Sequence, residues 1–74
     1  SPACSCLGAG QVTVIITVDP SGKVLNAKVQ DEVSSDDKCL RDFAIRAARL
    51  SRFSASGTAP ARQTGNIVYL FVAQ

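Results

Sequence analysis

Apolar and polar residues alternate in the first regular stretch of this chain, which begins near residue 10. One face of an extended segment here collects Val12, Val14, Ile16 and Val18, and the opposite face collects Thr13, Ile15 and Thr17. β-Branched residues dominate both faces, which is typical of a half-buried strand. The pattern therefore predicts a β-strand that ends at Val18.

A turn and a second alternating segment follow the first strand. Asp19-Pro20-Ser21-Gly22 predicts the turn, because proline fixes φ and glycine accepts a positive φ. The return strand is predicted over residues 23–30. Its two faces are expected to carry Leu25, Ala27 and Val29 on one side, and Val24, Asn26 and Lys28 on the other. Residues 10–29 thus predict a β-hairpin.

The apolar spacing then changes to three and four residues, which predicts one amphipathic helix ending near Phe53. Its apolar stripe is expected to contain Leu40, Phe43, Ala44, Ala47, Ala48 and Leu50. Burial of Leu40 and Phe43 should contribute about 1.5–3 kcal/mol each. Four consecutive residues could each cap the start of the helix: Ser34, Ser35, Asp36 and Asp37. The side facing water is expected to carry Arg41, Asp42, Arg46 and Arg49.

A third strand is predicted over residues 64–72, after a loop over residues 54–62 that is rich in Ser, Ala, Gly and Pro. Ile67, Tyr69 and Phe71 are expected to face the helix, because their bulk would fill the space above its alanines. Val68, Leu70 and Val72 would then form an apolar outer face beside Ile15. Such a face indicates a contact surface; the alternative is a two-sided core partly covered by the N-terminal segment.

These elements predict an α+β fold with β-β-α-β topology, in which one helix packs on one face of a three-stranded antiparallel sheet. The expected strand order is 2-1-3, with residues 10–74 forming the domain and residues 1–9 an irregular segment. The third strand is then a sheet edge. It lacks the lysine, proline or bulge that usually discourages edge pairing, so the edge is either a liability or the working surface.

Composition narrows the function classes further. The chain has 74 residues, 46% apolar and 19% charged, with a net charge of +2. One folded domain is expected, without the dense basic patch typical of nucleic-acid or anionic-membrane binding. No apolar run approaches the ~20 residues that cross a bilayer. The chain begins with neither Met nor a signal-peptide pattern, so we expect a mature product or an excised fragment.

The charged residues do not predict catalysis. The chain has no histidine, so acid–base chemistry would fall to Asp31, Glu32, Asp36, Asp37 and Asp42. These acids are expected in a loop or on a solvated helix face, and a role at the helix start explains them better than catalysis, so we predict no catalytic residue and no cofactor. The arginines at 41, 46, 49, 52 and 62 form no single stripe, so a solvated face is preferred to a nucleic-acid site.

Cys4, Cys6 and Cys39 form an odd set, so at least one thiol is unpaired or pairs between chains. Without histidine or a C-x-x-C motif, a structural metal site is not expected. A bridge from Cys4 or Cys6 to Cys39 requires the tail to fold back within about 6 Å. The preferred interpretation is a small buried Cys39 in the helix and two loosely held N-terminal thiols.

Several short motifs occur together in a characteristic order. They are Gly10-Gln11-Val12-Thr13-Val14, Asp19-Pro20-Ser21-Gly22-Lys23-Val24, Leu40 with Ala44, Arg52-Phe53, and the final Gln63-Thr64-Gly65-Asn66-Ile67-Val68-Tyr69-Leu70-Phe71. In this order the chain resembles the C-terminal domain of TonB-type energy transducers over residues 10–74. The last motif resembles variants from the Bacteroides group.

The resemblance implies a periplasmic domain whose full-length protein is anchored in the inner membrane and connects there to an energising complex. Its partner would be the TonB-box peptide of an outer-membrane transporter, added as a strand to transmit energy derived from the proton-motive force. The implied binding residues are Gln63, Thr64, Gly65, Asn66, Ile67, Val68, Tyr69, Leu70 and Phe71.

Two departures from the family pattern matter. Residues 1–9 lack the Tyr-Pro pair that members often carry, so the contacts of that segment are not transferred. Val68 and Leu70 stand at outward positions that are often polar, which favours a dimer or a fused neighbour. The competing hypothesis is an appended structural or assembly module of another periplasmic or membrane protein that pairs with a second copy through the same edge.

Overall fold

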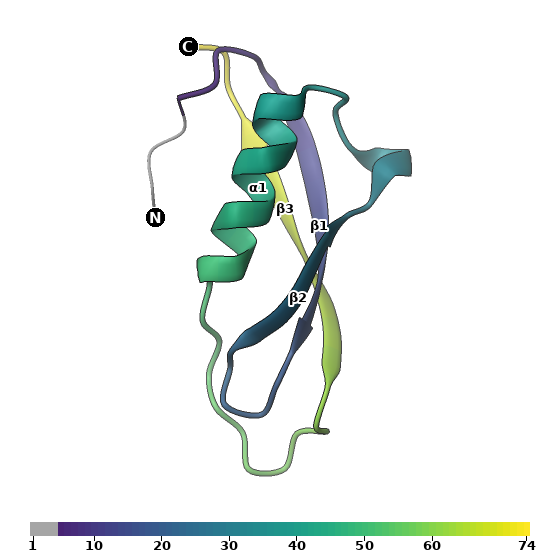
Figure 1. Ribbon diagram of the computed structural model, residues 1–74, viewed down its shortest axis with the longest axis vertical. Coiled ribbons are helices and arrows are strands. Elements are labelled where there is room, and N and C mark those ends of the chain that lie inside the picture. Colours follow the sequence, from purple (N-terminus) through teal and green to yellow (C-terminus); the bar gives the residue numbers. More distant parts are fainter. Residues whose placement is uncertain (1–4) are drawn as a thin grey trace.

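The computed structural model describes residues 5–74 (Figure 1). Along the chain, β1 (Gly10–Val18) and β2 (Val24–Val29) are followed by a short 3-10 helix, η1 (Asp31–Val33). The helix α1 (Lys38–Leu50) and the strand β3 (Gln63–Phe71) complete the fold. The three strands form one antiparallel sheet in the order β2-β1-β3. The predicted α+β class and strand order are therefore confirmed.

The start of α1 is fixed by Asp37. Its carboxylate accepts hydrogen bonds from the N–H groups of Cys39 and Leu40, at 2.9 and 3.3 Å. These are two of the N–H groups that a helix leaves without an internal partner, so Asp37 is the cap among the four residues proposed for that role. Ser35 supports it by accepting a hydrogen bond from the Asp37 N–H at 3.0 Å.

The helix ends at Leu50, earlier than the predicted end near Phe53. Ser51 is already extended, with φ −67° and ψ 148°. Arg52 forms a β-bridge with Lys23, and the Phe53 N–H donates to the Gly22 carbonyl at 2.9 Å. These contacts to the hairpin turn keep the backbone after residue 50 extended, which the apolar spacing alone could not reveal.

The hydrophobic core lies between α1 and the sheet, principally against β1 and β2 (Figure 1). The buried apolar residues of these three elements are Val12, Val14, Ile16, Val24, Ala27, Val29, Leu40, Ala44, Ala47 and Ala48. Leu40 is fully buried and Phe43 is half-buried, as expected of the anchoring residues. Leu50 was expected in the same stripe but is 66% exposed. It lies seven residues after Phe43, on the flank of the helix rather than its buried centre.

One prediction for β2 is wrong by a single residue. Thr17 pairs with Asn26 while Val18 pairs with Val24, so Leu25 is the extra residue of a β-bulge. Val24 therefore takes the buried position, and Leu25, predicted to share a face with Ala27 and Val29, is exposed. Beyond the bulge the predicted alternation holds, because Ala27 and Val29 are buried and Lys28 is exposed.

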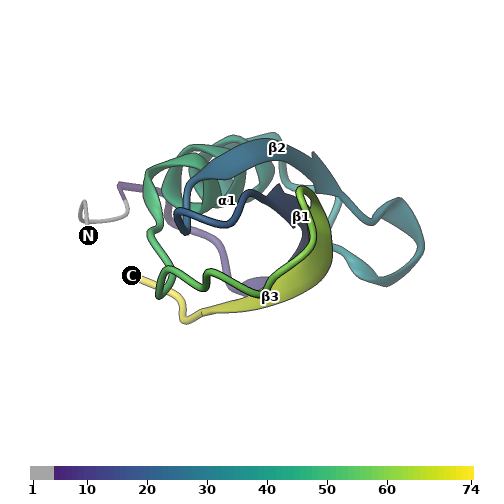
Figure 2. The ribbon, with the colours of Figure 1, turned by 90° about the horizontal axis from the view of Figure 1, so that it is seen from below.

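Seen along its length, the sheet curls, and α1 covers β2 and β1 far more than β3 (Figure 2). Ile67, Tyr69 and Phe71 pack against the core, and the Phe71 ring meets Phe43 edge-on at 5.7 Å between centroids. Val68, Leu70 and Val72 are 51%, 75% and 75% exposed. The predicted inner and outer sets are thus confirmed, and no described residues close a second core over the outer face.

The N-terminal segment is tied to the start of α1. Cys6 is buried and forms a disulfide with the exposed Cys39, with 5.8 Å between their Cα atoms. The preferred interpretation of a buried Cys39 and loose thiols is therefore wrong for this pair, while Cys4 lies outside the described residues. The segment also contacts the end of the chain, where the Gln74 N–H donates to the Leu7 carbonyl at 3.2 Å.

Candidate functional site

The free edge of β3 exposes backbone groups, and the pairing register identifies their residues. The Gln11 carbonyl accepts a hydrogen bond from the Ser35 N–H at 2.7 Å. The Thr13 carbonyl accepts one from the Gln30 N–H at 2.9 Å. These two residues of β1 therefore direct their backbone groups toward the β2 side of the sheet. Because this direction alternates along a strand, the intervening residues of β1 face β3.

The β3 partners of those intervening residues are Phe71, Tyr69, Ile67, Gly65 and Gln63, whose backbone groups face β1. The residues between them point their N–H and C=O groups outward: Thr64, Asn66, Val68 and Leu70. No other described segment pairs with this edge. The nine residues predicted to bind a partner thus divide into two sets, and the second set presents the open edge.

This edge lacks the features that usually block strand addition. The register between β1 and β3 is continuous from Gly10 to Val18, and residues 63–74 contain no proline and no charge. The opposite edge strand, β2, is shorter and carries both the bulge at Leu25 and a lysine, Lys28. The edge at β2 is therefore protected against pairing with another strand, whereas the edge at β3 is open to it.

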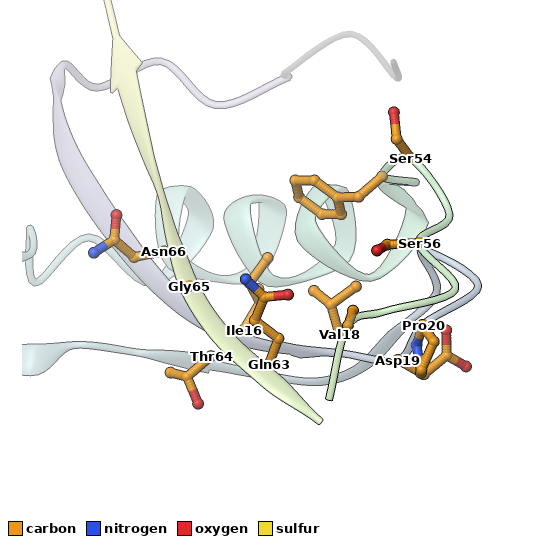
Figure 3. A pocket seen from close by; sticks show the side chains of 12 residues that line it. Ile16, Val18, Asp19, Pro20, Ser54, Ser56, Gln63, Thr64, Gly65 and Asn66 are labelled. Atoms are coloured by element: carbon orange, nitrogen blue, oxygen red, sulfur yellow. The ribbon is translucent and has the colours of Figure 1, made fainter. Parts of the chain in front are cut away.

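A pocket of about 240 Å³ lies at the start of β3, on the side of the sheet that faces the helix (Figure 3). Its lining residues come from the end of β1, the hairpin turn, the loop after α1 and the start of β3: Ile16, Val18, Asp19, Pro20, Phe53, Ser54, Ser56, Ala59, Gln63, Thr64, Gly65 and Asn66. In the close view, the Gln63 amide lies beside Ile16 and Val18, while Ser54 and Ser56 mark the loop wall.

The loop wall of this pocket is held to the hairpin by close backbone contacts. Gly22 has φ +90°, and a Cβ there would lie 1.8 Å from the Phe53 carbonyl oxygen. The Ser56 N–H donates to the Pro20 carbonyl at 2.9 Å. The hairpin turn predicted from Asp19-Pro20-Ser21-Gly22 therefore also positions the loop that follows the helix.

Asp19 is the acidic residue in the pocket wall. Its Oδ1 accepts from the Ser21 hydroxyl at 2.6 Å and from the N–H groups of Ser21 and Lys23 at 2.9 and 3.0 Å. The pKa of Asp19 is lowered, chiefly because the Ser21 hydroxyl stabilises its carboxylate form. Asp19 is thus a turn-forming carboxylate whose Oδ1 is already occupied.

The acids considered for acid–base chemistry lie elsewhere. Asp37 caps the helix, Asp42 pairs with Lys38 at 2.5 Å, and Asp31 pairs with Arg41. The Lys38 contact lowers the pKa of Asp42. Asp31, Glu32 and Asp36 are exposed, and none of the five acids lines the pocket. The arginines at 46, 49, 52 and 62 are exposed, and Arg52 donates to the carbonyls of Arg49 and Ser51 at the helix end.

The sequence analysis missed the pocket, and it considered the Cys6–Cys39 bridge without preferring it. The pocket had one readable signal, since Gly65 stands at an inward position where Ile67, Tyr69 and Phe71 continue the alternation. Among residues 5–74, no group of three or more His, Cys, Asp or Glu side chains could hold a metal ion. Within the same residues, no helix has the length and apolar character needed to span a membrane.

The chain was compared with known protein families, curated proteins and solved structures. No protein-family model matches the chain, and searches of curated proteins and of solved structures return no similar protein.

Proposed function

We propose that this domain binds an extended peptide by β-strand addition to the edge of β3, over Gln63–Phe71. The observation that carries the proposal is the outward direction of the backbone groups of Thr64, Asn66, Val68 and Leu70 along a regular, unprotected strand. Strand addition uses such groups for main-chain hydrogen bonds and uses neighbouring pockets for side-chain specificity. The domain acts as a binding module, not as an enzyme.

The resemblance to TonB-type energy transducers suggests the partner and the cellular location of this binding activity. The peptide would be the TonB box of an outer-membrane transporter, and the rest of the protein would anchor the domain to an inner-membrane energising complex. A disulfide such as Cys6–Cys39 is typical of oxidising compartments, which include the bacterial periplasm. That pairing supports a periplasmic location for the domain.

A second function is favoured by a separate observation. Val68 and Leu70 on the outer face of β3, together with Val72 just after its end, form an exposed apolar strip. Apolar surface of this kind is common at contacts between proteins. The domain would then serve as an assembly module that pairs with a second copy through the same edge.

A backbone amide NMR titration with a panel of TonB-box peptides separates the two functions. Transducer function predicts shifts concentrated in residues 64–72, with little change in β2. An absence of shifts together with dimer-sized tumbling would favour the assembly module. Shifts confined to α1 or β2 would contradict strand addition at β3.

A further inference from the structure

Gly65 occupies a strand position that does not require glycine. It pairs in register with Ile16, within an uninterrupted ladder, and its φ lies outside the positive range found at Gly22. A Cβ at Gly65 would meet only the Ile16 Cγ1 atom, at an ordinary contact distance of 3.9 Å. Glycine weakens a strand interior, and where no bulge or bend explains it, a close approach by another group often does.

The space that Gly65 leaves open continues into the pocket at the start of β3. At about 240 Å³, this pocket is smaller than the roughly 300–1,000 Å³ typical of small-molecule sites. It is suited to a single side chain. The inward-facing residues Ile16 and Val18 provide apolar lining, and the Gln63 amide lies beside them (Figure 3).

We propose that this pocket receives one uncharged apolar side chain from the strand that docks on β3, at the position opposite Gly65. The proposal rests on the proposed strand addition and specifies what its partner must carry. The backbone groups of Gly65 face β1, so in antiparallel addition the opposing residue forms a non-hydrogen-bonded pair with it. Such pairs bring side chains on the same face closest together, which directs the opposing side chain over the pocket.

The apolar lining of the pocket disfavours a basic side chain. Its inner wall is formed by Ile16 and Val18, and Asp19 is the charged residue of the lining. The Oδ1 atom of Asp19 is already occupied by donors from its own turn. A lysine or arginine would therefore lose its hydration against Ile16 and Val18, at a desolvation cost that an aliphatic or aromatic side chain avoids.

A second copy of this chain fits the pocket less well than an independent strand. In antiparallel pairing of two β3 edges centred on residue 66, 67 or 68, the residue opposite Gly65 is Ile67, Tyr69 or Phe71. Phe71 already packs edge-on against Phe43, and Tyr69 stacks on Phe71 with 6.4 Å between centroids. Like Ile67, both rings pack against the core of their own domain, so the occupant is expected to come from another protein.

The test uses the 74-residue chain and heptapeptides selected from a random display library. Gly65→Val fills the pocket, whereas the matched control Thr17→Val places the same side chain on the outer face of β1, outside the pocket lining and away from the free edge. The selected peptides should share one apolar position, and Gly65→Val should weaken their binding by about tenfold or more while Thr17→Val leaves it nearly unchanged. Thermal unfolding should show Gly65→Val to be at least as stable as the parent, since valine favours a strand.

Replacing the shared apolar residue of the peptide by alanine completes a double-mutant cycle with Gly65→Val. This change should weaken binding to the parent chain and have little further effect on Gly65→Val. If the parent and Gly65→Val bound the peptides with equal affinity, the proposal of a side-chain pocket would be overturned. If Val68→Pro lost binding in the same experiment, the proposal of strand addition would still hold. If the library were enriched on the parent chain no better than on Val68→Pro, both the pocket and the strand addition would be overturned. If the parent chain dimerised with increasing concentration and Gly65→Val abolished this dimerisation, the pocket would be assigned to a second copy.

Discussion

Gly22 shows how one residue links the hairpin to the loop after the helix. Its φ of +90° is costly for other residues, and a Cβ would collide with the Phe53 carbonyl. We expect Gly22→Ala to lower the free energy of unfolding by about 1–3 kcal/mol. Urea unfolding followed by circular dichroism measures this loss.

The matched control is Gly57→Ala, because a Cβ at Gly57 meets nothing within 4 Å. It should change the free energy of unfolding by no more than about 0.5 kcal/mol. A similar loss in both variants would mean that the close contact between Gly22 and Phe53 does not contribute to stability.

At the same scale, the periodicity of the sequence predicted the burial of a side chain correctly wherever that burial depends only on the regular alternation of a strand. Val12, Val14 and Ile16 follow the period of two and are buried as expected. Val24 and Leu25 break the expectation because the bulge depends on how β2 pairs with β1. The exposure of Leu50 depends on how much of the helix the sheet covers, which the spacing of apolar residues does not contain.

At the scale of elements, the sequence identified β3 as an unprotected edge but could not say which residues face outward. That division requires the register with β1, in which the Ile67 N–H faces Val14 and the Val68 N–H faces the free edge. Proline removes an N–H and is tolerated mainly where that group is not needed by the sheet. Substitutions at these neighbouring residues therefore separate folding from binding.

We expect Val68→Pro to keep the fold and to abolish binding of the peptide that gives the largest NMR shifts. Ile67→Pro should instead lower the free energy of unfolding by about 1–3 kcal/mol, because it leaves a ladder carbonyl without its donor. Amide spectra and urea unfolding of the two variants make the comparison. Retained peptide binding in a folded Val68→Pro domain would contradict binding at this edge.

At the scale of the whole molecule, the strand order followed from the sequence, whereas the pocket did not. A β-β-α-β order leaves few arrangements, and the observed β2-β1-β3 sheet is the expected one. The pocket instead joins β1, the loop after α1 and β3, and depends on the contacts of Gly22 and Pro20 with that loop. Such tertiary contacts leave no periodic signal in the sequence.

The disulfide is the other long-range feature, and its contribution to stability can be measured. Cys6 and Cys39 are 33 residues apart, and closing a loop of this length should stabilise the domain by about 3–4 kcal/mol through the entropy of the unfolded chain. This is a large share of the ~5–15 kcal/mol typical of folded domains. We therefore expect Cys6→Ser/Cys39→Ser to show a much lower urea midpoint than the oxidised parent.

The same double variant tests what the N-terminal segment contributes to the binding edge. The segment reaches the end of the chain through the contact of Leu7 with Gln74, whereas the outward residues Thr64, Asn66 and Val68 lie in the strand before it. Where the variant is still folded, peptide affinity should match that of the parent. A loss of affinity without unfolding would instead mean that the disulfide holds residues 5–9 as part of the binding surface.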